Sequence, residues 1–202
     1  MQANMLNNQS RQRAKTGQLD SEAGVTILEM VVSMLILTVG LLGLAASIGY
    51  AVTVSNRGRN LTNTKLVAVS LLEQMETLRN TEQLTFDQIA NAGAVDNTGA
   101  PWDFAGFPTG FQSLSANPGP DGIFGTSDDF ISPGADNIYG TGDDFTDTSL
   151  AVAGYSREIV ITNLNTNLKR IQVTVRYPDG GGQMRNLVAV SYLNNDARSN
   201  FR

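Results

Sequence analysis

Residues 25–54 read VTILEMVVSMLILTVGLLGLAASIGYAVTV, and Glu29 is the single charged residue among them. As a helix, at about 1.5 Å per residue, this segment would be about 45 Å long, which exceeds the roughly 30 Å hydrocarbon core of a bilayer. The segment is therefore long enough to span a membrane. A charged side chain inside such a helix costs on the order of 3 kcal/mol near the bilayer centre and less near an end, so it is usually kept where it meets a partner. Glu29 therefore predicts a cationic partner.

The residues before this segment end at Gly24, and the apolar segment begins at once with Val25. This junction, with a carboxylate at Glu29 in the first turn, resembles the processing site of type IV prepilins. In that family a dedicated prepilin peptidase cuts after the glycine on the cytoplasmic side and methylates the new amino terminus. The resemblance implies a prepilin leader over residues 1–24, cleavage between Gly24 and Val25, N-methylation of Val25 and an assembly role for Glu29. In the filament, the family's carboxylate offsets the terminal charge of a neighbouring subunit.

The junction departs from the family in two ways. The family usually has Phe at the position of Val25, and its leaders are often shorter than residues 1–24. Two other classes of segment explain less. A secretory signal peptide has an apolar stretch of only about 7 to 15 residues, followed by its cleavage site. A single-span anchor accounts for the apolar length but gives Glu29 no role.

The charge pattern around the segment does not decide its orientation alone, because cations lie on both sides. These cations are Arg11, Arg13, Lys15, Arg57 and Arg59. Those on the amino side agree with a cytoplasmic leader.

The composition limits the classes of function. The chain has 202 residues, no cysteine, no histidine and a net charge of −5. It therefore has no disulfide, thiolate nucleophile, common zinc ligand or histidine base, and we expect no enzymatic activity. The negative charge argues against a broad electrostatic interaction with nucleic acid, so no nucleic-acid partner is expected. The length suits one modest head domain on a long helix.

A second helical pattern follows the apolar segment. Over residues 60–79, apolar side chains recur at three- and four-residue steps with charged residues between them. These apolar residues are Leu61, Ala68, Leu71, Leu72, Met75 and Leu78. We therefore expect one helix over about residues 25–79. Its transmembrane or filament-core half is residues 25–54, and its amphipathic half, residues 55–80, packs on a globular head.

The next segment, residues 81–154, is predicted to be a long loop region, because its greater part is rich in Gly, Pro, Asn and Asp. The region contains a repeat: residues 118–130, PGPDGIFGTSDDF, recur fifteen residues later as residues 133–145, PGADNIYGTGDDF. No Lys or Arg occurs from residue 80 to residue 156, so the region is acidic.

The repeat places aspartates at matching positions of its two copies. Calcium takes roughly 6 to 8 oxygen ligands, and turns rich in Asp and Gly can supply them without strain. We therefore hypothesise calcium sites here, although the spacing is not that of an EF-hand. The alternative is that the Asp-Gly pairs form turns in a solvated acidic loop. The candidate calcium ligands are Asp121, Asp128, Asp129, Asp136, Asp143 and Asp144.

Three segments after the loop region have the pattern of β-strands. They are residues 155–163, 168–177 and 184–193. In the second of them Ile171, Val173 and Val175 alternate with polar residues, as in a half-buried strand. Residues 179–182, DGGG, are a hairpin signal. The pattern predicts an antiparallel meander over residues 155–202, with its apolar face on the helix.

The strand sequence LKRIQVTV and the Gly-rich turn after it resemble the carboxyl-terminal sheet of minor pilins of the PilV type, and so does the stretch GLLGLA at residues 40–45. The expected fold class is α+β. It is the type IV pilin fold, with a long N-terminal α-helix packed on a C-terminal antiparallel β-sheet and a long loop insertion.

The resemblance implies a minor type IV pilin, a structural subunit that assembles into a surface filament after cleavage. Its partners would be prepilin peptidase, other pilins, the inner-membrane assembly platform and, before assembly, membrane lipid. It would lie in the bacterial inner membrane and then in an extracellular pilus. The alternatives are a type II secretion pseudopilin in a periplasmic pseudopilus, a calcium-dependent adhesive pilin and a DNA-uptake pilin. The cations available for DNA uptake are Lys169, Arg170, Arg176 and Arg185.

Overall fold

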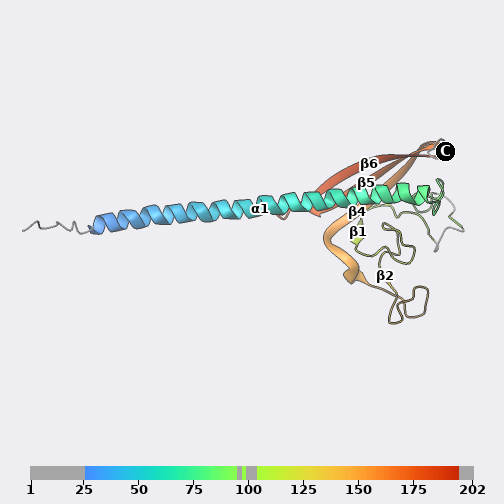
Figure 1. Ribbon diagram of the computed structural model, residues 1–202, viewed down its shortest axis with the longest axis horizontal. Coiled ribbons are helices and arrows are strands. Elements are labelled where there is room, and N and C mark those ends of the chain that lie inside the picture. Colours follow the sequence, from blue (N-terminus) through green and yellow to red (C-terminus); the bar gives the residue numbers. More distant parts are fainter. Residues whose placement is uncertain (1–25, 95–96, 99–103, 196–202) are drawn as a thin grey trace, which may run out of the picture. The chain divides into compact units, whose positions relative to one another are not determined.

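The computed structural model describes residues 26–94, 97–98 and 104–195. The fold is α+β, with one long helix and a four-stranded antiparallel sheet in the order β1-β4-β5-β6 (Figure 1). The elements are α1 (Ile27–Asn80), β1 (Gln112–Ser115), β2 (Ile131–Ser132), β3 (Phe145–Thr146), the 3₁₀ helix η2 (Thr148–Leu150), β4 (Ala151–Asn165), β5 (Leu168–Pro178) and β6 (Met184–Asn194). Strands β2 and β3 form a separate two-stranded ladder.

The chain divides into two compact units, Met1–Ile48 and Gly49–Arg202, and α1 contributes to both. In the first unit the apolar side chains of α1 are exposed. Thr26 precedes the helix, and its Oγ1 accepts a hydrogen bond from the Glu29 N–H at 3.3 Å, which is an N-cap contact. The helix is long and apolar enough to cross a membrane. The predicted helix is thus confirmed from Ile27 onward, and its predicted first residue, Val25, lies outside the described residues.

In the second unit one stripe of α1 is buried, at Thr64, Ala68, Leu71, Met75 and Leu78. These residues recur at steps of three and four, so they share one helix face. The stripe packs against apolar side chains of the sheet, namely Ile159, Ile171, Val173, Val175 and Leu193. The predicted stripe is confirmed except at its margins, because Leu61 is exposed and Leu72 is only partly buried.

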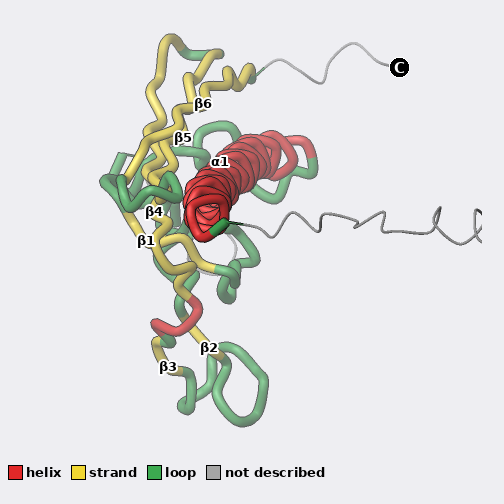
Figure 2. Tube along the Cα trace, turned by 90° about the vertical axis from the view of Figure 1, so that its left-hand side faces the viewer, coloured by secondary structure: helices red, strands yellow, loops and turns green. Residues whose placement is uncertain are grey.

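The predicted antiparallel meander is confirmed as β4, β5 and β6. Val173 lies opposite Ile159 on β4 and opposite Ala189 on β6, so the central strand β5 is paired along both edges. The alternation in β5 is also confirmed, since Ile171, Val173 and Val175 are all buried. Figure 2 shows the sheet along one side of the second unit's part of α1.

The predicted hairpin turn joins β5 and β6 and contacts α1. The Asp179 carboxylate accepts hydrogen bonds from the N–H groups of Gly181 at 2.8 Å and Gln183 at 3.2 Å. These N–H donors, Gly181 first, lower the pKa of Asp179. Gly180 has a φ of 79°, and a Cβ there would lie 3.3 Å from the Arg57 backbone nitrogen, so glycine suits the close approach of this turn to α1.

The region predicted as a loop contains a fourth strand of the main sheet, β1, which pairs with β4 antiparallel. Further along the same edge of β4, the side-chain amide of Asn91 binds the β4 backbone in place of a strand. Its Nδ2 donates to the Ile159 carbonyl at 2.8 Å, and its Oδ1 accepts from the Ile161 N–H at 2.7 Å. The segment with β2 and β3 extends away from the sheet in both views (Figures 1 and 2).

Candidate functional site

The first candidate site is the amino-terminal end of α1. The predicted cleavage residues, Gly24 and Val25, lie outside the described residues. Glu29 lies in the first turn of α1 and is exposed. The partial positive charge of a helix N-terminus favours a carboxylate at that place. Within the described ranges the ion pairs join other residues, so Glu29 has no cationic side chain beside it there.

The second candidate site is the repeat, whose first copy, residues 118–130, is organised by its aspartates. The Asp121 Oδ1 accepts from the Ile123 N–H at 2.7 Å, and the Asp121 N–H donates to Asp128 Oδ2 at 3.1 Å. The Asp129 carboxylate accepts from the Gly125 N–H at 3.0 Å. Each bond satisfies a backbone donor that a turn leaves without a partner, as Asx turns do.

The second copy, residues 133–145, repeats these bonds one for one. The Asp136 Oδ1 accepts from the Ile138 N–H at 2.9 Å, and the Asp136 N–H donates to Asp143 Oδ2 at 3.3 Å. The Asp144 Oδ2 accepts from the Gly140 N–H at 2.7 Å. The two segments are therefore two copies of one loop, made by the same residue types at the same spacing.

A glycine near the start of each copy explains why the sequence folds this way. Gly119 has a φ of 69° and Gly134 a φ of 66°, in the left-handed region that disfavours side chains. A Cβ at Gly119 would collide with the Asp128 carbonyl, and one at Gly134 with the Asp143 carbonyl. The chain therefore closes each loop at a place where only glycine fits.

The first copy is docked in the interior by an ion pair. The Arg157 Nη2 lies 2.6 Å from Asp129 Oδ2, and the side chains are 2% and 1% exposed. The Arg157 Nη1 also donates to the Ser113 carbonyl at 2.8 Å. Burial raises the pKa of Asp129 and lowers that of Arg157, while the opposite charge of each partner acts against these shifts. Breaking such a buried pair from one side leaves an uncompensated charge.

Two further contacts hold the first copy. Ile123 is fully buried and belongs to the hydrophobic core. On α1, the Gln74 amide contacts the Phe124 backbone twice: Nε2 donates to the carbonyl at 2.9 Å, and Oε1 accepts from the N–H at 3.1 Å. The loop is thus fixed to the helix, to the core and to β4.

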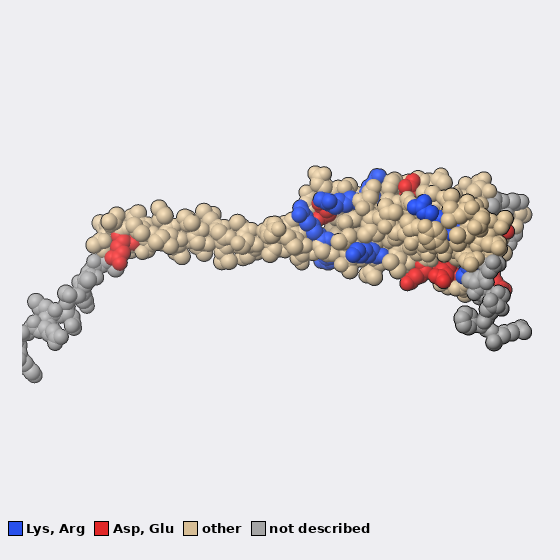
Figure 3. All heavy atoms as spheres, turned by 90° about the horizontal axis from the view of Figure 1, so that it is seen from above, with Lys and Arg blue, Asp and Glu red and all other residues tan. Residues whose placement is uncertain are grey.

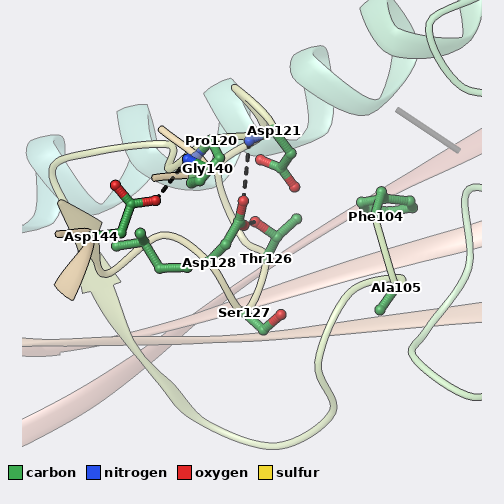
Figure 4. A pocket seen from close by; sticks show the side chains of 10 residues that line it. Phe104, Ala105, Pro120, Asp121, Thr126, Ser127, Asp128, Gly140 and Asp144 are labelled. Atoms are coloured by element: carbon green, nitrogen blue, oxygen red, sulfur yellow. Dashed lines mark hydrogen bonds between the residues drawn. The ribbon is translucent and has the colours of Figure 1, made fainter. Parts of the chain in front are cut away.

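A cavity of about 340 Å³ lies beside the repeat, and Figure 4 shows aspartates of both copies around it. Asp121, Asp128 and Asp144 line it together with Phe104. Burial raises the pKa of Asp121 to about 7, and the nearby Asp128 charge adds to the shift. Asp121 therefore changes charge near neutral pH.

The second copy is exposed where the first is buried. Ile138 is 60% exposed, and the Oδ1 of Asp144 is buried without a hydrogen-bond partner. The exposed carboxylate of Asp143 accepts from the Thr141 hydroxyl at 2.6 Å and from the Ala135 N–H at 2.8 Å, which lower its pKa. The second copy is therefore a folded loop whose isoleucine is not covered, although its Tyr139 hydroxyl accepts a hydrogen bond from the Asn117 Nδ2 at 3.1 Å.

These contacts bear on the calcium hypothesis. The predicted ligand carboxylates bind backbone N–H groups and threonine hydroxyls, and Asp129 also binds Arg157. Across residues 26–94, 97–98 and 104–195, no group of three or more acidic side chains is placed to hold a metal ion. Calcium binding stays a hypothesis, and the bonds observed are those of the alternative, in which aspartates form turns.

Lys169, one of the four cations considered for DNA uptake, does not lie on the surface. Lys169 is 2% exposed, and its Nζ donates to the carbonyls of Phe86 at 2.6 Å and Ile89 at 2.9 Å. Burial lowers its pKa, and the Asp87 charge opposes the shift. The alternation of β5 predicts this burial, because Lys169 lies two residues before the buried Ile171 and so faces the same side of the sheet.

Sequence reasoning did not identify Arg157 and Gln74 as the residues that dock the repeat. Arg157 has the parity of the buried Ile159 on β4, so its inward orientation is readable from the alternation once the strand is known. Its partner Asp129 is distant in the sequence, and no local pattern joins them. Comparisons of the chain with protein families, with curated proteins and with solved structures find no match.

Proposed function

We propose that this chain is a minor type IV pilin, which a prepilin peptidase cleaves after Gly24 and which assembles through α1 into a surface filament. The observation that carries the proposal is Glu29, an exposed carboxylate in the first turn of a helix that is long and apolar enough to cross a membrane. It follows the Gly24–Val25 junction after residues 26–28, and this junction resembles a prepilin processing site.

The apolar half of α1 supports the proposal because its exposed apolar side chains require contact with lipid or with other protein chains. From Ile27 to Val54 its large apolar side chains are exposed, among them Leu28 at 73% and Tyr50 at 73%. Apolar surface of this extent is not stable in water and marks an interaction with lipid or protein. A prepilin has lipid as its cover before assembly and the helices of other subunits afterwards.

Cleavage would supply the cation that Glu29 lacks. A cut after Gly24 leaves a positively charged amino terminus on every copy, about one helical turn from Glu29. In a bundle of parallel helices, a carboxylate of one copy can then lie beside the terminal amine of the next. Such an ion pair offsets the free-energy cost of placing the charged Glu29 side chain among apolar helices.

The test is filament incorporation of a Glu29→Gln variant, which removes the charge and keeps the size. We expect cleavage to proceed and the amount of chain in purified filaments to fall by on the order of tenfold, which corresponds to about 1.4 kcal/mol. Ser33→Ala, one turn further along the same exposed helix, is the matched control and should assemble normally.

Unchanged incorporation of Glu29→Gln would contradict the assembly role. The place of recovery separates a pilin from the alternative, a type II secretion pseudopilin. A pilin is found in filaments sheared from the cell surface, and a pseudopilin stays in the periplasm.

A further inference from the structure

The two copies of the repeat share the aspartate bonds described above and differ in their surroundings. Ile123 of the first copy is fully buried, whereas the equivalent Ile138 of the second is 60% exposed. Asp129 of the first copy pairs with Arg157 at 2.6 Å, whereas the ion pairs of the described residues do not include the equivalent Asp144. The second copy therefore has an isoleucine that no apolar cluster covers and an aspartate that no cation of the described chain binds, at the two positions with which the first copy docks.

The docked copy shows which chemistry this loop recognises. Its isoleucine enters a hydrophobic cluster, and its last aspartate binds a cationic side chain. A surface that receives the second copy thus needs apolar side chains next to a cation.

The second copy is also prepared for binding. Asp136, Asp143 and Asp144 each accept hydrogen bonds from backbone N–H groups of their own loop, so the loop is closed without a partner. A loop that is already ordered loses little conformational entropy when it docks. The segment that carries it extends away from the sheet, which leaves it accessible to a second molecule (Figure 2).

A surface of the required kind lies on α1. Arg59, Leu66 and Val69 recur at helical steps on one exposed face, and Lys65 lies next to Val69. Leu66 is 64% exposed and Val69 is 46% exposed. The sequence has no acidic residue from residue 30 to residue 72, so these cations have no acid on neighbouring turns.

The charges of the two surfaces are complementary. Figure 3 shows Lys and Arg side chains gathered mainly near the end of the second unit where its part of α1 begins. The loop, by contrast, lies in the stretch from residue 80 to residue 156, which has no Lys or Arg. Within one described chain the two surfaces do not cover each other, because Ile138 and Leu66 are both exposed.

We propose that the second copy of the repeat docks on the α1 face of a second copy of this chain, with Ile138 against Leu66 and Val69 and with Asp144 beside Lys65. The contact is heterologous, so each chain offers one loop and one helix face, and the association can continue from copy to copy. The proposal deepens the assembly function and rests on it for the arrangement that brings copies together.

Cysteine cross-linking of the full chain in membranes tests this contact, and the chain has no cysteine of its own. The variant with Ile138→Cys and Leu66→Cys should form covalent dimers and larger multimers on mild oxidation. Either single variant should form none, and a mixture of the two single variants should form dimers only. A pair with Ile138→Cys and Val188→Cys is the matched control, because Val188 is also exposed, at 55%, but lies on β6.

The ion pair has its own test. Asp144→Asn keeps an oxygen for the Gly140 N–H and removes the charge. In the Ile138, Leu66 double-cysteine chain it should lower the cross-linked fraction about two- to fivefold, as expected for a partly exposed pair, and make the fraction independent of salt. Absent multimers, or equal cross-linking through Val188, would overturn the proposal. Normal filament incorporation without these cross-links refutes this contact alone, whereas cross-linking in a chain that enters no filament refutes the proposed function.

Discussion

At the scale of single residues, the two ion pairs of the described chain differ in their surroundings. Arg157 and Asp129 are both buried, whereas Arg185 is 64% exposed beside Asp179. A buried pair costs desolvation when it forms, and its disruption from one side leaves a charge without a partner. An exposed pair contributes little to stability.

We therefore expect Arg157→Ala to lower the free energy of unfolding by about 3 to 5 kcal/mol. Arg185→Ala is the matched control, with an expected loss of less than about 1 kcal/mol. Thermal and denaturant unfolding of the full chain in detergent, followed by circular dichroism, measures both. Equal losses in the two variants would show that burial of the Arg157 pair has no special weight.

A second prediction concerns Asp121, whose pKa burial raises to about 7 from its ordinary value of 3.8. Between these values the folded state keeps a proton that the unfolded state has released, so the contribution of Asp121 to stability falls as the pH rises from about 4 to 7 and is constant above that range. Asp121→Asn, which keeps the oxygen for the Ile123 N–H, should remove this part of the pH dependence. The measurement is the free energy of unfolding of both chains across the range, and an unchanged slope in the variant contradicts the assignment.

For a side chain on a strand, the alternation of the strand predicts whether it faces the core, but it does not predict its hydrogen-bond partner. Lys169 and Arg157 are buried cations on strands whose apolar neighbours of the same parity face the core. That orientation can be read from the alternation once the strands are known. The hydrogen-bond acceptors of the two cations cannot be read from the sequence, because the carbonyl of Phe86 and the carboxylate of Asp129 lie far away along the chain.

At the scale of elements, the periodic patterns of the sequence predicted the helix and the antiparallel meander. The amphipathic part of the helix has a period of 3.6, and the meander has a period of 2. The helix, β5 and β6 lie at nearly the expected bounds, whereas β4 begins at Ala151, within the region expected to be loop, and not at residue 155. Strand β1 was missed because its sequence, QSLS, has no apolar alternation and pairs with β4 only in the folded chain. The repeat was visible as a repeat, but its sequence does not tell which copy docks.

Gly119 and Gly134 are at equivalent positions of the two loops, so the same substitution at each can be compared for its effect on the free energy of unfolding. Gly119→Ala and Gly134→Ala introduce the same collision in the same loop, each at a positive φ. Such a change costs roughly 1 to 2 kcal/mol or more. Only the first copy is docked through Ile123, so Gly119→Ala should lower the unfolding free energy of the head, and Gly134→Ala should leave it nearly unchanged.

Limited proteolysis completes this comparison, because cleavage within the second copy should become faster in Gly134→Ala. Equal destabilisation of the head by both substitutions would mean that the second copy also supports the core.

At the scale of the whole molecule, the chain has no cysteine, so no disulfide closes its long loop region. Between residues 104 and 154 the buried Arg157–Asp129 pair, the Gln74 contacts and the aspartate turns take that role. The chain thus combines a head whose long loop region is held by polar contacts with a helix whose apolar side chains are exposed from Ile27 to Val54. Assembly with other copies or subunits is the function that this combination supports.

We propose that the leader is removed after Gly24 and that the new amino terminus is the cation that pairs with Glu29. Mass spectrometry of the mature chain, isolated from cells that contain a prepilin peptidase, tests it most directly. We expect the mature chain to begin at N-methylated Val25. A mature chain that begins at Met1, or at any residue other than Val25, would contradict it.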